Sequence, residues 1–508
     1  MITAIESNGQ VGRRREAMWF TLAGLPFIVL EIAALGAWAM VTRPFWLDEI
    51  STYLVAGTQS LPESMRSLAA GADYNPPAAF FLYRAVGLLA GGLSAVAARV
   101  VAAACVVGAL TTVYVLLRDQ FSPWAAAIGT LAVWAQQVVM HAAFEARFYG
   151  PLLLASGCLL LALLRTARRV PTPASAFWLA LASIAVCTVH YFGILSWGIG
   201  IATVLLFASG SRAATIRRLL PSIAGPLALT ACAPLYFGQR ASITVPTWIP
   251  DVTVMEAGRL LAIFLLTMPL AVALACWALA QVRAWRAGAR AERVAGRTFA
   301  LGPGLLLAQV AVPFTLVAFS LLVQPATEPR YWIVGALATA PVVALVVSRA
   351  DARIRWIAAL AIVASSVKTM WGEANRAEAF VRRVREDVRV ATQLAGSGAL
   401  VVARWPDTLY PVLQERPELR SHTAVLDSTP FDTTNRFFAI VRDLARVNRR
   451  LYGFPNLVTP AELGRLPSFY LMEPKSGGAP TTGEFPRHAI SRVADRAFHL
   501  ALRPPGNP

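Results

Sequence analysis

The sequence predicts an all-α polytopic membrane bundle of about eleven transmembrane helices, followed by a small α/β domain. Long apolar runs recur from Trp19 to about Trp371, and each can cross a hydrocarbon core of roughly 30 Å as a helix. Barrel strands would alternate rather than run apolar. Charged residues make up only 15% of the 508 residues, and after Trp371 they become frequent. We therefore expect a transmembrane domain at 1–371 and a soluble α/β domain at 372–508.

Eleven apolar runs are expected to span the membrane. They cover residues 18–41, 96–117, 122–141, 149–165, 176–192, 193–209, 219–237, 260–281, 299–323, 331–348 and 354–371. The segment 176–209 needs two crossings, because a single helix of that length would extend about 51 Å, and Gly193 is the expected hinge. The run 77–90 is short and carries Arg84 in its middle, so we expect an interfacial helix in the first outer loop.

The distribution of arginine predicts the orientation. Basic clusters fall in alternate loops, at 118, 165–169, 212–218, 283–297 and 349–355. Short cytoplasmic loops carry an excess of arginine and lysine, so the N-terminus is expected in the cytoplasm and domain 372–508 outside it. The protein is thus predicted to be a multi-pass protein of the inner (plasma) membrane. Topology signals also explain the net charge of +18, and nucleic acid is not expected as a partner.

With this orientation, polar residues that lie near span ends gather on the outer face. They are Asp48, Glu49, Asp73, Tyr74, Asn75, His141, Glu145, Arg147, Tyr149, His190, Tyr191, Glu328, Arg330 and Tyr331. Charges near a bilayer are costly unless they face a cavity or a partner, which makes a functional site the default hypothesis. A carboxylate can take a proton from a hydroxyl or bind a divalent cation, and arginines bind phosphate. Together they suggest a phosphate-bearing lipid as substrate.

Each of these residues also has a structural interpretation. Asp48 and Glu49 would suit the first turn of a helix, where acids are favoured. Glu145 and Arg147 would suit a loop ion pair. Arg330 would suit a membrane-surface anchor, and His190 a hydrogen-bonded histidine at a helix end. These alternatives remain open at the level of the residues alone.

Five motifs in order resemble the C-type glycosyltransferases that use polyprenyl-phosphate sugars. This family includes the dolichyl-phosphate-mannose protein mannosyltransferases and the lipid A aminoarabinose transferases. The motifs are WLDEISTYLVA (46–56), YNPPAAFFLYRAVGLL (74–89), FEARFYGPLLLASGCLLLALL (144–164), VHYFGILS (189–196) and EPRYWIVGALATAPVVAL (328–345). The resemblance covers roughly 18–348. The segment 372–508 carries no matching motif, and Asn75 replaces the commoner histidine of the second motif.

The resemblance implies a fold, a reaction and residue roles. The fold would be the C-type bundle, and the enzyme would be an inverting hexosyl- or pentosyltransferase. A monosaccharide would move from a polyprenyl-phosphate donor to a hydroxyl of a glycoconjugate, lipid or protein. The catalytic residues would be Asp48, the base, and Glu49. The residues implied for donor phosphate or substrate binding are Asn75, Glu145, Arg147, Tyr149, His190, Tyr191, Arg330 and Tyr331. A divalent metal ion, where present, would bind Asp48 and Glu145.

Two other functions fit parts of the same pattern. A transporter or flippase of a lipid-linked or hydrophilic substrate would also be polytopic, although transporters often contain inverted repeats, which this sequence does not show. A related C-type enzyme would use a lipid-pyrophosphate oligosaccharide instead of a lipid-monophosphate sugar.

Overall fold

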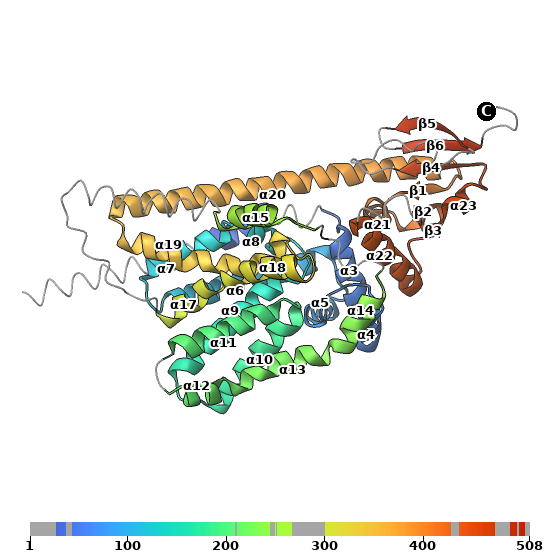
Figure 1. Ribbon diagram of the computed structural model, residues 1–508. Coiled ribbons are helices and arrows are strands. Elements are labelled where there is room, and N and C mark those ends of the chain that lie inside the picture. Colours follow the sequence, from blue (N-terminus) through green and yellow to red (C-terminus); the bar gives the residue numbers. More distant parts are fainter. Residues whose placement is uncertain are drawn as a thin grey trace, which may run out of the picture.

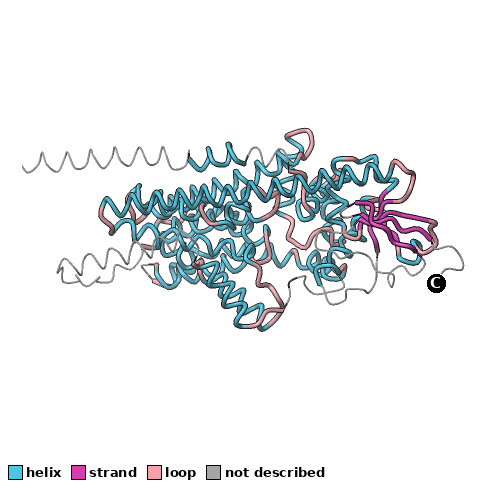
Figure 2. Tube along the Cα trace, turned by 90° about the horizontal axis from the view of Figure 1, so that it is seen from above, coloured by secondary structure: helices cyan, strands magenta, loops and turns pink. Residues whose placement is uncertain are grey.

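The computed structural model describes residues 27–36, 43–208, 211–243, 249, 251–266, 300–427, 436–472, 488–494 and 497–502. The parts of the expected spans 18–41 and 260–281 that fall at 18–26, 37–41 and 267–281 lie outside these residues. The described chain is a bundle of mostly parallel and antiparallel helices with a small sheet at one end (Figures 1 and 2). The predicted helical membrane bundle with a C-terminal α/β domain is confirmed.

Six helical segments of the described residues are long and apolar enough to cross a membrane. They are α6 (Ala95–Leu117), α9 (Tyr149–Arg168), α12 to α14 (Arg212–Ala241), α17 with α18 (Leu301–Leu322), η3 with α19 (Pro329–Arg349) and α20 (Ala352–Ala395). Three shorter apolar helices, α7 (Pro123–Trp134), α10 (Pro173–Val189) and α11 (Gly193–Phe207), occupy other expected spans. The total of eleven crossings stays a prediction.

Several of these segments are subdivided, and short helices connect them. The subdivided ones are α12 (Arg212–Leu219), η2 (Leu220–Ile223), α13 (Ala224–Ala231), α14 (Ala233–Ala241), α17 (Leu301–Ala308), α18 (Ala311–Leu322), η3 (Pro329–Ala338) and α19 (Thr339–Arg349). The short ones are the π-helix η1 (Ile32–Gly36), α3 (Leu47–Ala56), α4 (Leu61–Ala69), α8 (Gln137–Ala143) and α15 (Val254–Leu265). The expected span 122–141 is thus divided between α7 and α8, with the break at Ala135 and Gln136.

Local capping residues explain where the main helices begin. The Ser94 hydroxyl accepts a hydrogen bond from the Ala97 amide at 3.1 Å and caps α6. Asp351 caps α20 in the same way, through the Ile354 amide at 2.9 Å. α7 and α10 each begin with a hydroxyl cap followed by proline. Such caps satisfy amide groups that have no partner inside the helix, so the short loop sequences set the ends of the helices.

The expected interfacial helix is α5 (Ala78–Leu89). Its 12 residues make a helix of about 18 Å, which is too short to cross a bilayer. Figure 1 views α5 nearly down its own axis, whereas α6, α9 and α20 run across the picture. α5 therefore lies crosswise to the bundle, as expected for a helix on the membrane surface.

The segment 176–209 forms two helices, as predicted. α10 ends at Val189, and α11 begins at Gly193 after a turn of three residues. The turn brings Gly193 so close to α10 that a Cβ atom there would lie 1.8 Å from the Val186 carbonyl oxygen. Glycine is therefore required at this hinge, and it lets the turn present residues 190–192 at the end of the hairpin.

One helix joins the membrane bundle to the C-terminal domain. α20 continues without a break through residue 371, where we expected the domain boundary, and its 44 residues extend about 66 Å. Figure 1 shows it along the whole upper edge of the molecule, from the far end of the bundle to the sheet. The expected charged helical stretch 373–394 is the second half of this helix.

The C-terminal domain contains a mixed sheet with strand order β3-β2-β1-β4-β6-β5. The strands are β1 (Val401–Ala403), β2 (Thr423–Leu426), β3 (Leu457–Val458), β4 (Ser468–Met472), β5 (His488–Ala494) and β6 (Ala497–Leu502). Strands β1 to β4 pair in parallel, and β6 pairs antiparallel with β4 and β5. The helical elements are α21 (Pro406–Glu415), η4 (Pro417–His422), α22 (Arg436–Tyr452) and α23 (Pro460–Leu463). α22 packs its apolar residues against the helices of the first loop, α3, α4 and α5. This contact places the domain beside the predicted site.

Candidate functional site

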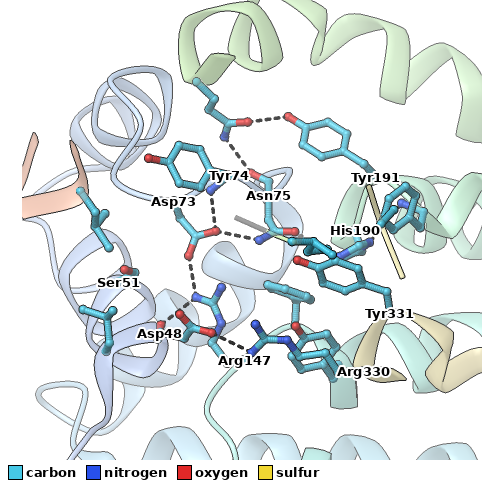
Figure 3. Close-up of a pocket in the computed structure, with 18 of the residues that line it drawn as sticks. Asp48, Ser51, Asp73, Tyr74, Asn75, Arg147, His190, Tyr191, Arg330 and Tyr331 are labelled. Atoms are coloured by element: carbon cyan, nitrogen blue, oxygen red, sulfur yellow. Dashed lines mark hydrogen bonds and ion pairs between the residues drawn. The ribbon is translucent and has the colours of Figure 1, made fainter. Parts of the chain in front are cut away.

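A cavity of about 410 Å³ lies where the first-loop helices, the ends of the bundle and the C-terminal domain meet. Eight of the ten residues predicted for the site line it: Asp48, Asn75, Arg147, Tyr149, His190, Tyr191, Arg330 and Tyr331. Figure 3 shows most of them converging on one space from separate segments of the chain. The two remaining predicted residues, Glu49 and Glu145, do not line the cavity.

Asp48 and Arg330 form an ion pair inside the cavity. The Arg330 Nη1 atom lies 3.0 Å from Asp48 Oδ2, and the two side chains keep 21% and 27% of their surface exposed. The guanidinium also lies 5.9 to 6.0 Å from the ring centres of Trp46, Tyr149 and Tyr331. The pair thus places a carboxylate that can accept a proton beside a cation that can bind an anion.

Arg147 is held more tightly than Arg330. Its Nη1 atom donates to Asp73 Oδ2 at 2.5 Å, to the Asp48 carbonyl oxygen at 2.7 Å and to Thr52 Oγ1 at 3.0 Å. Burial acts to lower the pKa of Arg147, but Asp73 and Asp48 outweigh it and hold that pKa above its ordinary value. Arg147 is therefore a fixed positive charge in the wall of the cavity.

A chain of hydrogen bonds positions Asp73 and Asn75. Asn75 Nδ2 donates to Asp73 Oδ1 at 2.7 Å, and Gln239 Nε2 donates to the Asn75 carbonyl at 3.0 Å. The Tyr191 hydroxyl donates to Gln239 Oε1 at 2.8 Å. Figure 3 shows these bonds running in sequence from Arg147 toward Tyr191. Asn75 is thus held in the wall of the cavity by hydrogen bonds. Gln239, to which no sequence motif pointed, connects two of the predicted residues.

His190 lies within a group of aromatic rings and has a defined tautomer. Its ring centre lies 4.7, 5.3 and 5.5 Å from those of Phe148, Phe192 and Tyr331. The Phe192 amide donates to His190 Nδ1 at 3.0 Å. An acceptor nitrogen carries no proton, so the imidazole is neutral with its proton on Nε2. His190 can therefore donate a hydrogen bond to a ligand without adding charge.

Glu49 faces away from the cavity and is enclosed by arginines. Its carboxylate accepts from Arg99 Nε at 2.8 Å, from Arg99 Nη2 at 2.7 Å and from the Ala146 amide at 2.9 Å, with Arg43 Nη2 at 3.4 Å. Burial acts to raise the pKa of Glu49, but Arg99 and Arg43 outweigh it and lower that pKa to about 2. Glu49 is thus ionised and joins α3 to α6 and to the segment before α9.

Glu145 also lies outside the cavity. It is 1% exposed, and its Oε2 atom lies 3.3 Å from His141 Nε2. The other nitrogen of His141 contacts Glu373 of α20 at 3.2 Å. Asp48 and Glu145 therefore have separate partners and do not meet as metal ligands. Within the described ranges, no group of three or more histidine, cysteine and acidic side chains is placed to hold a metal ion.

The C-terminal part of the chain completes the cavity. Phe380 and Arg383 of α20, with Val441 and Leu444 of α22, form one side of it. Gln414 of α21 accepts a hydrogen bond from the Phe45 amide at 2.8 Å, next to the start of α3. No local sequence pattern points to these residues, because they become neighbours of Asp48 only when the domain packs on the bundle.

Comparisons with known proteins give a structural match only. No protein-family model and no curated protein matches the sequence. The crystal structure of ArnT from Cupriavidus metallidurans in the apo state matches 94% of this chain and 98% of its own, with a TM-score of 0.55 and 14% identity. The crystal structure of the same protein bound to undecaprenyl phosphate has a TM-score of 0.53 and 13% identity, with the same coverage. The chain therefore has the fold of ArnT over nearly its whole length, as the resemblance in the sequence predicted.

Proposed function

We propose that the protein is an inverting glycosyltransferase that moves a monosaccharide from a polyprenyl-phosphate donor to an acceptor hydroxyl. The pairing of Asp48 with Arg330 at 3.0 Å, in a cavity that also holds Arg147, carries this proposal. A carboxylate can remove the proton of a hydroxyl, and guanidinium groups suit phosphate oxygens. The ArnT structure bound to undecaprenyl phosphate supports the same class of donor for this chain.

In the proposed reaction, Asp48 takes the proton from the acceptor hydroxyl. The hydroxyl oxygen attacks the anomeric carbon from the face opposite the phosphate, and the bond from that carbon to the phosphate oxygen breaks. The electron pair leaves with the polyprenyl phosphate, whose charge is stabilised by Arg330 and Arg147. Such preorganised charge accounts for a large share of catalysis in many enzymes.

The other residues of the cavity bind and orient the donor in this proposal. The Nε2–H group of His190 donates a hydrogen bond to the phosphate or the sugar, and Tyr149 and Tyr331 pack against them. Asn75 and Tyr191 hold the opposite wall through Gln239. We place Glu49 and Glu145 as residues that support this arrangement from outside the cavity.

The proposed setting is the outer face of the plasma membrane, with the N-terminus in the cytoplasm. The C-terminal domain then lies outside the cytoplasm, where Phe380, Arg383, Val441 and Leu444 line the cavity next to Asp48. We assign this wall to the acceptor, which is a glycoconjugate, lipid or protein with a free hydroxyl.

A genetic comparison tests the function. Mass spectrometry of envelope glycoconjugates from a strain with and without the gene should reveal one missing sugar substituent. Complementation with Asp48→Asn should not restore it, although the variant inserts in the membrane at normal levels. The matched control is Glu63→Gln, a charge-removing change at a partly exposed residue of α4 that does not line the cavity, which should restore the sugar. Restoration by Asp48→Asn would refute Asp48 as the base.

A further inference from the structure

Arg330 has two anionic partners that compete for it in the proposed reaction. In the cavity its Nη1 atom is bound to Asp48 at 3.0 Å, yet a donor phosphate would need the same guanidinium. Arg147 has no such conflict, because Asp73, Thr52 and the Asp48 carbonyl hold its Nη1 atom and its side chain is only 7% exposed. Of these two cations, Arg330 is the more exposed, at 21%, and the one whose partner is the proposed base.

We propose that Arg330 changes partner when the donor binds, so that donor binding releases the base. Before the donor binds, Arg330 pairs with Asp48. When a polyprenyl phosphate enters, the guanidinium turns to the phosphate, and Asp48 Oδ2 is left to accept a proton from the acceptor hydroxyl. This inference rests on the proposed function and adds an order to it: the donor binds first, and the acceptor is deprotonated only afterwards.

The setting of the pair favours such an exchange. Both side chains are partly exposed to the cavity, so neither is locked by the protein interior. A guanidinium binds phosphate and carboxylate with the same planar set of donors, and the surrounding rings of Trp46, Tyr149 and Tyr331 present faces along which it can shift.

The exchange predicts that Asp48 competes with the ligand. Asp48→Asn should therefore tighten binding of undecaprenyl phosphate by about two- to fivefold, the range expected for losing a partly exposed ion pair. Arg330→Gln should weaken that binding. In the double variant Asp48→Asn with Arg330→Gln, the gain from Asp48→Asn should disappear, because no guanidinium remains to be released.

The test is a double-mutant cycle on full-length protein in nanodiscs, with undecaprenyl phosphate as the probe and the Kd as the readout. Each variant is first checked for monodisperse elution, and Asp48→Ser replaces Asp48→Asn if the latter does not insert. The matched control is Glu328→Gln, which removes an equal charge close to Arg330. Glu328 Oε1 lies 3.8 Å from Arg330 Nε, a longer contact than the 3.0 Å between Asp48 and Arg330. Glu328→Gln should change the Kd less than Asp48→Asn does.

Three results would overturn the exchange. The first is an unchanged Kd for undecaprenyl phosphate in Asp48→Asn. The second is equal tightening by Asp48→Asn with and without Arg330, and the third is equal tightening in Glu328→Gln. The last two would indicate simple repulsion between the removed carboxylate and the phosphate. In those cases the proposed function still stands if sugar transfer depends on Asp48. Failure of the wild-type protein to bind undecaprenyl phosphate would instead reject the donor class, and the exchange with it.

Discussion

Replacing Glu49 by glutamine should destabilise the fold much more than replacing Asp48 by asparagine, although the two acids are adjacent. Glu49 is 0% exposed, and it neutralises Arg99, which is also 0% exposed. Glutamine keeps the shape of the side chain but removes its charge. The change therefore leaves the Arg99 guanidinium buried with no carboxylate at 2.7 to 2.8 Å.

The contacts of Glu49 set the size of the effect. Breaking a buried ion pair by removing one partner costs about 3–5 kcal/mol. The glutamine oxygen can still accept one hydrogen bond, from Arg99 or from the Ala146 amide, so we expect the lower end, about 3 kcal/mol. Asp48→Asn should cost less than about 1 kcal/mol, because its ion pair is partly exposed.

The assay is unfolding of purified protein by titration with SDS, followed by tryptophan fluorescence. The companion variant Glu49→Gln with Arg99→Met removes both buried charges, and it should recover at least half of the loss, since apolar replacements of whole pairs are often tolerated. A loss below about 1 kcal/mol for Glu49→Gln would refute the role of Glu49 in joining α3 to α6. A loss of sugar transfer in Glu49→Gln protein whose stability is unchanged would refute that role as well.

The pH dependence gives the same prediction a second check. The folded protein holds the pKa of Glu49 at about 2, below the value of roughly 4.3 for an unfolded chain. The stabilisation is therefore complete above that unfolded value and is lost as pH falls toward 2. The stability difference between wild type and Glu49→Gln should stay constant from about pH 5 to 8. A difference that shrinks already near neutral pH would contradict the buried ion pairs.

The remaining predictions concern the cavity and the first span. Asp73→Asn should lower sugar transfer at least about tenfold in folded protein, because Arg147 loses its charged partner at 2.5 Å; unchanged transfer would argue against Arg147 in the reaction. Gln239→Leu should lower transfer more than Tyr191→Phe, because Gln239 bonds both sides of the cavity, and the reverse order would contradict the network. Glu31→Ala should destabilise the protein by about 1–3 kcal/mol, since its carboxylate accepts hydrogen bonds at 2.6 Å from two buried donors; Glu31→Gln should cost less in the same SDS titration.

Arginine counting and the order of the motifs predicted much of the cavity from sequence. Asp48, Arg147, His190 and Arg330 come from segments far apart in the chain, and they line one space. Membrane helices bring alternate loops to the same face, so residues at span ends on one side become neighbours. The short interfacial helix α5 followed from its length and from Arg84.

Adjacency in sequence did not separate Asp48 from Glu49. Successive residues of a helix point about 100° apart, so in α3 one acid faces the cavity and the other faces Arg99. Arg99 lies inside an apolar run, and no neighbouring residue indicates that its buried partner is Glu49, fifty positions earlier. Gln239, Arg383 and Leu444 could not be predicted as cavity residues for a related reason. Their places in the cavity depend on how α14, α20 and α22 pack.

The unbroken course of α20 couples the cavity to the thickness of the bilayer. Phe380 and Arg383 lie on the same helix as the apolar segment 354–371, only about 14 to 18 Å beyond its last residue. A helix whose apolar length exceeds the thickness of the surrounding hydrocarbon tilts to compensate. Such a tilt moves both side chains relative to Asp48, so thinner lipids should change the width of the cavity without any change in sequence.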